Sequence, residues 1–182
     1  MRLFVGLPVP DSALYEAAKR DLVQAASDAR VVPPGSHHVT VRFLGEMAEP
    51  DGVIAALDRA CNGRPALPCV VEGLGSFPGG GFPADKKARV AWAGLRAPGV
   101  EALAQTVLEA TARFGEPPER RPFVAHVTLA RMARPADLRL VIEQHRRTLF
   151  AEGVLDRVVL YSSTPTPRGS AYEAEHTVRL GR

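Results

Sequence analysis

The sequence is poor in cysteine, in tryptophan and in long apolar runs, and each shortage excludes a class of protein. Cys61 and Cys69 are separated by seven residues and have no second pair, so neither a zinc-finger spacing nor a disulfide framework is present. No window of 18 apolar residues occurs, which argues against a transmembrane helix. The opening MRLFVGLPVPDS lacks the apolar core and cleavage site of a signal peptide. We therefore expect a cytoplasmic protein with buried or half-buried thiols that does not associate with membranes.

The balance of charges is also modest. The 182 residues are 46% hydrophobic and 24% charged, which is typical of one globular body with a sizeable core. The net charge of +3 is too small to indicate a nucleic-acid-coating protein. Most of the basic residues are arginine, which binds phosphate through two parallel hydrogen bonds. Codon bias in a GC-rich genome would give the same excess, so composition alone does not decide between the two explanations.

Apolar periodicity and turn residues predict alternating strands and helices. The expected strands are 3–7, 38–44, 67–74, 89–95, 124–131, 154–161 and 172–180. The expected helices are 11–29, with Asp11 as its cap and Leu14, Ala18, Leu22 and Ala25 on one face, and 51–61, 98–114 and 135–150. The glycine-rich segment 73–83 is expected to be a mobile loop.

The two halves of the chain repeat this pattern. The middle strand of the first half begins His38-Val39-Thr40-Val41, and that of the second begins His126-Val127-Thr128-Leu129. A proline stands 28 residues before each of these histidines. We interpret the chain as one bilobed domain spanning 1–182, with approximate sequence halves 1–86 and 87–182 and an internal duplication too short for a repeat array.

The His-x-Thr pattern carries the chemistry. Side chains alternate along a strand, so His38 and Thr40 share one face, as do His126 and Thr128, while the intervening valines point into a core. Two such strands placed face to face present two imidazoles and two hydroxyls. One imidazole can accept a proton from an attacking group and the other can donate one to a leaving oxygen, while the hydroxyls donate to phosphate oxygens. This set suits phosphodiester hydrolysis without a metal.

Other sequence signatures are missing. No P-loop, G-x-S-x-G elbow or His-Glu-x-x-His motif occurs. Residues 73–78 begin like a dinucleotide fingerprint but have proline where its last glycine belongs. The remaining histidines, His37, His145 and His176, lack a matching motif. We expect no metal and no cofactor.

With these motifs the sequence resembles the 2H phosphoesterase superfamily and, within it, the RNA 2′,3′-cyclic phosphodiesterases, also called 2′-5′ RNA ligases. The resemblance runs through most of the chain and is carried by RLFVGLPVP (2–10), HVTVRFLGE (38–46), GLGSFP (73–78), RVAWAGL (89–95), FVAHVTLAR (123–131) and the closing strands over 159–180. The chain departs from the family pattern at Ala125, where proline is frequent, and at Val41, where leucine is frequent. Both positions lie off the catalytic face.

The resemblance implies an α+β fold of two pseudo-symmetric lobes, whose antiparallel sheets face a central cleft with helices outside. It implies opening of a terminal RNA 2′,3′-cyclic phosphate to a 2′-phosphate, with possible 2′-5′ joining in reverse. In this family pattern His126 matches the proton acceptor that activates water, and His38 matches the donor to the departing 3′ oxygen. The expected partner is such an RNA end, and the expected state is a monomer.

Three residues beside the motifs are candidates for substrate binding. Arg131 lies on the other face of a regular strand from His126, although the strand's end could turn it toward the cleft. Arg42 shares the face of His38 and Thr40 in a regular strand. Phe43 could stack on a base, but an aromatic residue in a strand is more often part of the core. The segment 75–87 could close over the RNA end or be a plain exposed loop.

Two other functions stay open at this point. The first is a 2H esterase acting on a small cyclic phosphate or an oligoadenylate. The second is an RNA-end-binding module without turnover, against which the intact motifs argue.

Overall fold

The computed structural model describes residues 1–78, 85–167 and 169–181. In this part of the chain the strands are β1 (Arg2–Pro8), β2 (Ala29–Val31), β3 (His38–Glu46), β4 (Leu67–Phe77), β5 (Ala88–Arg96), β6 (His126–Ala136), β7 (Leu149–Leu155), β8 (Arg157–Thr166) and β9 (Gly169–Arg179). The helices are α1 (Ala13–Ala25), α2 (Asp51–Cys61), α3 (Val100–Thr111) and α4 (Arg139–Gln144), with a 3-10 turn η1 (Asp85–Lys87).

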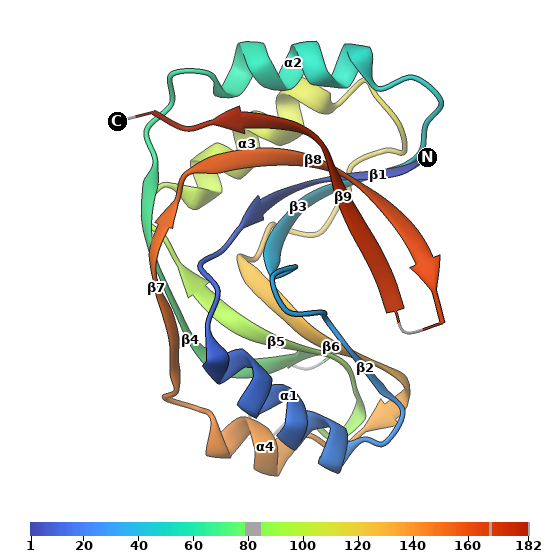
Figure 1. Ribbon diagram of the computed structural model, residues 1–182, viewed down its shortest axis with the longest axis vertical. Coiled ribbons are helices and arrows are strands. Elements are labelled where there is room, and N and C mark those ends of the chain that lie inside the picture. Colours follow the sequence, from blue (N-terminus) through green and yellow to red (C-terminus); the bar gives the residue numbers. More distant parts are fainter. Residues whose placement is uncertain (79–84, 168, 182) are drawn as a thin grey trace.

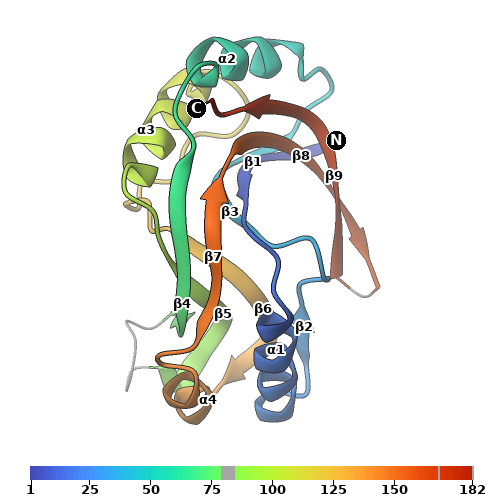
Figure 2. The ribbon, with the colours of Figure 1, turned by 60° about the vertical axis from the view of Figure 1, so that its left-hand side comes forward.

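The strands form one curved antiparallel sheet in the order β7-β4-β5-β6-β3-β1-β8-β9, with β2 paired to β6. We call β3, β1, β8 and β9 with their helices the β3 lobe, and β6, β5, β4 and β7 with theirs the β6 lobe. Helices α2 and α3 cover the β3 lobe, and α1 and α4 cover the β6 lobe at the opposite end of the molecule (Figures 1 and 2). The predicted bilobed α+β fold is therefore confirmed, although the two sheets are continuous.

The lobes do not coincide with the sequence halves, because two helices cross between them. Helix α1 follows β1 of the β3 lobe, yet it packs against β6, β7 and α4. Helix α3 follows β5 of the β6 lobe, yet it packs against β3 and α2. Strand β4, from the first half of the sequence, pairs with β5 in the β6 lobe, and strand β8, from the second half, pairs with β1 in the β3 lobe. Each lobe is thus built from both halves of the chain.

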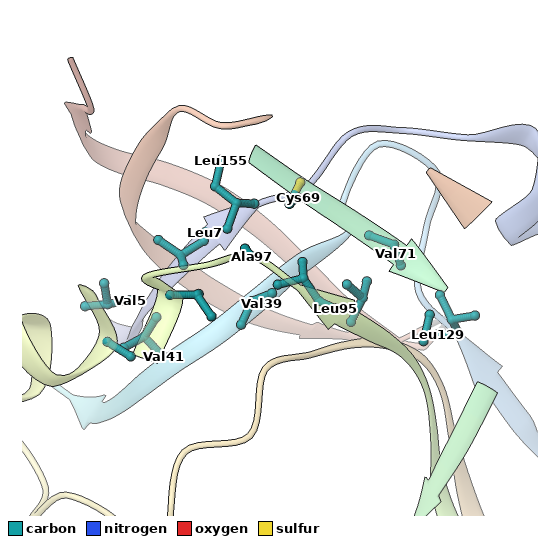
Figure 3. Close-up of a cluster of buried hydrophobic side chains, with 14 of the residues drawn as sticks. Val5, Leu7, Val39, Val41, Cys69, Val71, Leu95, Ala97, Leu129 and Leu155 are labelled. Carbon is teal, nitrogen blue, oxygen red and sulfur yellow. The ribbon is translucent and has the colours of Figure 1, made fainter. Parts of the chain in front are cut away.

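A single hydrophobic core connects the lobes. Figure 3 shows Leu7 and Val39 of the β3 lobe in one cluster with Val71, Leu95 and Leu129 of the β6 lobe. These five side chains are buried. The core lies on the face of β3 and β6 that carries the valines of the two motifs, which leaves the opposite face for the histidines and threonines.

Helix α1 is shorter than its sequence pattern predicts. Ser12 caps it by accepting a hydrogen bond from the amide of Leu14, and Asp11 in turn accepts one from the amide of Ser12. Of the predicted apolar face, Ala18 and Leu22 are buried, whereas Leu14 and Ala25 are exposed and the neighbouring Tyr15 and Ala26 are buried in their place. The helix ends at Ala25 because the segment that follows leaves it to pair with β6 as β2.

The predicted helix over 135–150 is also wrong for most of its length. Ala136 still pairs with Ala88 across β6 and β5, and Leu149 already pairs with Glu72 across β7 and β4. Only α4 remains helical between them, because strand pairing at both ends overrides a local preference that is weak over so few residues. The strand expected over 154–161 is likewise divided between β7 and β8.

No helix within the described residues is long and apolar enough to cross a membrane. Cys61 and Cys69 are both buried and free, and burial raises the pKa of each thiol.

A buried charged cluster supports the strand that carries the first motif. Lys19 of α1 is 2% exposed, and its ammonium donates to the carbonyl of Val32 at 2.7 Å and lies 3.4 Å from His37 Nε2. It also forms an ion pair with Glu16. The His37 ring stands 4.4 Å from that of Tyr15. Burial lowers the pKa of His37 to about 4, and the charge of Lys19 contributes in the same direction.

The pKa of His37 makes the fold sensitive to acid. His37 binds a proton near pH 6.5 in the unfolded chain and only near pH 4 in the folded protein. Its contribution to the free energy of unfolding is therefore complete above pH 6.5 and is lost as the pH falls toward 4. The full loss from this one group is about 3 kcal/mol. We expect His37→Gln, which keeps an acceptor near Lys19 without titrating, to flatten the urea-derived unfolding free energy between pH 6.5 and 4. Equal slopes for the variant and the natural protein would contradict the assignment.

Candidate active site

The two sheets meet at a single pair of residues, Val39 of β3 opposite Val127 of β6. Both valines are fully buried, and each is the middle residue of one His-Val-Thr motif. The junction between the lobes therefore runs through the centres of both motifs. A pairing shifted by one residue would turn one motif into the core, since side chains alternate between faces.

The antiparallel direction of this junction decides which side chains meet. His38 lies across from Thr128, and Thr40 lies across from His126, each one position from the valine pair. Side chains at directly opposite positions have Cβ atoms about 5 Å apart. The structure thus brings the four predicted motif residues together on one face, with each imidazole facing the other motif's hydroxyl.

Each imidazole is held by a backbone carbonyl two residues before it. His38 Nδ1 donates to the carbonyl of Ser36 at 2.8 Å, and His126 Nδ1 donates to that of Val124 at 2.7 Å. Because a carbonyl can only accept, the proton of the neutral ring is on Nδ1 in both histidines. Within the described residues, neither Nε2 atom has a hydrogen-bond partner. Both Nε2 atoms are therefore available to a bound molecule.

Two adjoining cavities open on this arrangement. The one on the His126 side has a volume of about 350 Å³ and the one on the His38 side about 280 Å³; we call them the His126 cavity and the His38 cavity. They share four residues, which are Thr40, Phe43, Thr128 and Arg131. The shared wall thus contains both hydroxyls, one aromatic ring and one guanidinium.

Matching β-bulges bring Phe43 and Arg131 to this wall. Val41 in β3 and Leu129 in β6 each lack a partner in the register with the next strand, and each stands three residues after its motif histidine. An extra residue reverses the alternation beyond it. Arg42 and Ala130, which precede Phe43 and Arg131, are consequently buried, as are the two bulge residues. Phe43 is 46% exposed, and Arg131 is also exposed.

The expectation that Arg42 faces the cleft beside His38 and Thr40 is wrong, because the bulge turns it to the other side of β3. Its guanidinium is 3% exposed. It donates to the hydroxyl of Thr111 at 2.8 Å and to the carbonyls of Phe114 at 2.8 Å and Glu116 at 2.9 Å. Arg42 therefore ties the end of α3 to β3 and is not free to meet a substrate.

The bulge at Leu129 turns Arg131 onto the face of β6 that carries His126 and Thr128, whereas in a regular strand it would lie on the opposite face. The lining of both cavities includes Arg131, and within the described residues its side chain has no hydrogen-bond or ion-pair partner. Phe43, for which a core position was the more ordinary expectation, is likewise part of the cavity wall.

Aromatic rings that the sequence did not single out surround each histidine. His126 meets the ring of Phe77 edge-on with centroids 5.0 Å apart, and Trp92 lies 6.2 Å away. Gly75 makes room for Trp92, since a Cβ there would collide with the indole. No local pattern distinguishes these aromatics from core residues, because their role depends on strands β4 and β5 reaching the site.

The aromatic surroundings of His38 are different. Phe4, Tyr161 and Tyr172 stand around it, with ring centroids 4.9, 5.6 and 5.2 Å from the imidazole. Gly6 permits this packing, because a Cβ there would lie 3.3 Å from both the His38 and Tyr161 rings. These residues come from β1, β8 and β9, which meet β3 only in the folded chain.

The site favours neutral imidazoles. Burial lowers the pKa of His38, the hydrogen bond to Ser36 opposes this, and the charges of Arg131 and His126 lower it further. Burial also lowers the pKa of His126, with an opposing hydrogen bond to Val124 and a lowering contribution from Arg131. One guanidinium thus acts on both imidazoles.

The other histidines are engaged elsewhere. His145 Nε2 donates to the carboxylate of Asp21 at 2.7 Å, and His176 Nε2 donates to that of Asp58 at 2.8 Å. Within the described residues, no three His, Cys, Asp or Glu side chains come together as a metal-binding group. Of the expected closing segment 75–87, residues 75–77 belong to β4 and 85–87 to η1, and the part over 79–84 lies outside the described residues.

The shared position of Arg131 leads to a measurable effect. We expect Arg131→Gln to raise the pKa of both His38 and His126, because a positive charge that disfavours each imidazolium is removed. Histidine titration by NMR gives both values. Arg20→Gln, on the exposed side of α1, is the charge-matched control and should leave them unchanged. A shift in only one histidine would contradict the shared placement.

Comparison with known proteins agrees with this geometry. A sequence model of the 2′-5′ RNA ligase superfamily matches residues 9–166. A protein of Archaeoglobus fulgidus named RNA 2′,3′-cyclic phosphodiesterase is 30% identical over 179 residues, which cover 95% of this chain and 97% of that protein. One of the same name from Aquifex aeolicus is 29% identical over 192 residues, covering 100% of this chain and 98% of its own.

Solved structures share the whole fold. The crystal structure of TT0787 of Thermus thermophilus superposes with a TM-score of 0.72 at 26% identity, covering 99% of this chain and 98% of that one. Escherichia coli LigT complexed with 3′-AMP superposes with a TM-score of 0.71 at 21% identity, covering 100% and 98%. Since the family model matches most of its length, and with the paired His-x-Thr strands in place, this chain belongs to the 2′-5′ RNA ligase superfamily.

Proposed function

We propose that this protein is an RNA 2′,3′-cyclic phosphodiesterase, which opens a terminal 2′,3′-cyclic phosphate to a 2′-phosphomonoester. The observation that carries the proposal is the pair of opposed imidazoles, each with Nδ1 held by a carbonyl and Nε2 open to the cavities. The names of the relatives support the same substrate. The protein acts as a cytoplasmic monomer on RNA ends and uses no cofactor.

The two imidazoles divide the proton transfers. His126 Nε2 takes a proton from water as the water oxygen attacks phosphorus. His38 takes part as the imidazolium, protonated on both nitrogens; as the bond from phosphorus to the 3′ oxygen breaks, its Nε2 gives that oxygen a proton and the ring becomes neutral. The product carries a 2′-phosphate and a free 3′-hydroxyl. The assignment of acceptor to His126 and donor to His38 follows the family pattern, because the pseudo-symmetric geometry permits either order.

The shared wall of the cavities supplies the electrostatic support. The hydroxyls of Thr40 and Thr128 donate to the non-bridging phosphate oxygens, where charge grows in the transition state. Arg131 adds a fixed positive charge to the same oxygens. Phe43 offers its exposed ring to the base of the terminal nucleotide.

The 2′-5′ joining reaction uses the same groups with a different nucleophile. A 5′-hydroxyl of a second RNA in the place of water would be deprotonated by His126, and its attack would join the ends through a 2′-5′ bond. Bulk water favours the hydrolytic direction.

The mechanism predicts activity with EDTA present and a large loss in either histidine variant. His38→Ala and His126→Ala should each lower kcat for a cyclic-phosphate RNA by about two to four decades, the usual size of a general acid or base contribution. His176→Ala, whose ring pairs with Asp58 at 2.8 Å, is the control and should stay near the natural rate. Chromatography must show a 2′-phosphate; a 3′-phosphate product or a requirement for added metal would refute the mechanism.

The same groups predict the pH profile. The acidic limb of kcat/KM requires a neutral acceptor and the basic limb a protonated donor. Because the pKa values of both histidines lie below the ordinary 6.5, both limbs move to lower pH, so the maximum of kcat/KM falls on the acid side of pH 6.5. In Arg131→Gln the maximum should move to higher pH. A maximum near pH 8 in the natural protein would be incompatible with this assignment.

A further inference from the structure

The His38 cavity has a polar wall that the mechanism does not use. Arg2 of β1 pairs in register with Ser163 of β8, and Ser163 pairs with Tyr172 of β9. Side chains at paired positions share a face, so these three form a row across adjacent strands. Ser170 lies two residues before Tyr172 and belongs to the same wall. Figure 1 shows this end of the β8–β9 hairpin projecting toward the side where β2 and β6 lie.

The polar side chains of this wall have no hydrogen-bond or ion-pair partners within the described residues. They are the guanidinium of Arg2 and the hydroxyls of Ser163, Ser170 and Tyr172. Glu46, the register partner of Arg2 on β3, pairs instead with the N-terminal ammonium at 3.3 Å. A free guanidinium beside three hydroxyls is the donor set that a phosphodiester requires.

The strands β4 and β5, which stand in the corresponding place of the β6 lobe, present apolar side chains to the site. Phe4 and Val90 occupy equivalent places, each opposite the residue five positions after a motif histidine. Two residues before them stand Arg2 on one strand and Ala88 on the other. The His126 cavity is lined there by Val90 and Phe77, while its charged lining residues Glu119 and Arg121 come from the segment that precedes β6. The strand walls beside the two imidazoles thus differ, because the wall on β1, β8 and β9 carries Arg2 and three hydroxyls and the wall on β4 and β5 carries Phe77 and Val90.

The connectivity of ribose matches this asymmetry. Around the ring the base is attached at C1′, beside the 2′ oxygen, and the upstream chain leaves through C4′ and C5′, beside the 3′ oxygen. With the 3′ oxygen at His38, the upstream chain leaves on the side of the His38 cavity. The base then lies toward the His126 cavity, where Phe77 and Val90 form part of the lining.

We propose that the His38 cavity is a subsite for the phosphodiester on the 5′ side of the terminal nucleotide, with Arg2 as its charged contact and Ser163, Ser170 and Tyr172 as hydroxyl donors. The inference rests on the proposed function and extends it, since it makes a nucleotide chain the preferred substrate over a free nucleoside cyclic phosphate. A phosphate at the 5′ position is sufficient to occupy the subsite.

Three substrates with the same reacting end test the subsite. They are adenosine 2′,3′-cyclic phosphate, its 5′-phosphorylated form, and the dinucleotide ApA ending in a 2′,3′-cyclic phosphate. We expect kcat/KM to be roughly five- to tenfold higher for the two substrates with a 5′ phosphate, mainly through KM, as one charge-assisted contact at an open site provides. The advantage should weaken with added salt.

Arg2→Gln should bring the ratio between the 5′-phosphorylated and the unphosphorylated substrate close to one, and Arg2→Lys should keep part of it. Arg20→Gln, which removes an equal charge from the exposed side of α1, should keep the full ratio. An uncharged methylphosphonate linkage in the dinucleotide should lose the advantage; if it keeps it, the second nucleoside and not the phosphate is recognised, and the proposal is wrong.

The possible failures are distinct. If the natural protein hydrolyses adenosine 2′,3′-cyclic phosphate but shows no preference for a 5′ phosphate, or if the preference survives in Arg2→Gln, the subsite is refuted while the proposed function stands. If none of the three substrates is hydrolysed, the proposed function fails and the subsite inference fails with it.

Discussion

The pairing of Val39 with Val127 is the constraint on which the site depends. It is the one register pair between β3 and β6. Because each valine is the middle residue of a motif, this pair determines how the two motifs are placed relative to each other. The valines bring apolar volume to the core on one face and thereby hold the histidines and threonines on the other. Catalytic geometry and core packing are consequently two faces of the same six residues.

Symmetry at this junction gives two equivalent acid–base groups, and the reaction needs them to be unequal. The inequality comes from the surroundings. His126 stands beside Phe77 and Trp92 of β4 and β5, whereas His38 stands beside Tyr161 and Tyr172, with Arg2 and Ser163 in the wall of its cavity. An asymmetric substrate would meet different surroundings at the two rings, whereas the paired motifs by themselves permit either order of proton transfer. The duplicated halves supply the chemistry, and the differences between them supply its direction.

The residues that local patterns identify are those whose role is local. The His-x-Thr motifs follow from strand alternation, and helix α2 has the predicted bounds 51–61 because its apolar spacing and its place on the surface agree. The position of Arg42 could not be predicted, since the bulge at Val41 is visible only in the pairing of β3 with β1. The aromatic residues around the histidines were missed for a similar reason, because each reaches the site on a strand distant in sequence.

The long helix predicted over 135–150 shows the opposite error. Helix-forming residues are present there, but β6 and β7 extend into the segment from both sides and pair with β5 and β4. Non-local pairing decided the structure, and a single sequence carries little information about it. The acceptors that fix both imidazoles, in contrast, are carbonyls only two residues away, so each ring is oriented by its own strand.

The exchange of α1 and α3 between the lobes affects how the cleft can move. Each helix is tethered to a strand of one lobe and packed on the other, so separating the lobes would pull both helices out of a continuous core. Both crossing helices therefore resist a hinge motion of the kind that opens and closes two-domain enzymes. The cleft is instead a standing feature of the molecule, with its reacting groups already aligned, and adjustment to an entering RNA end falls to side chains at its rim.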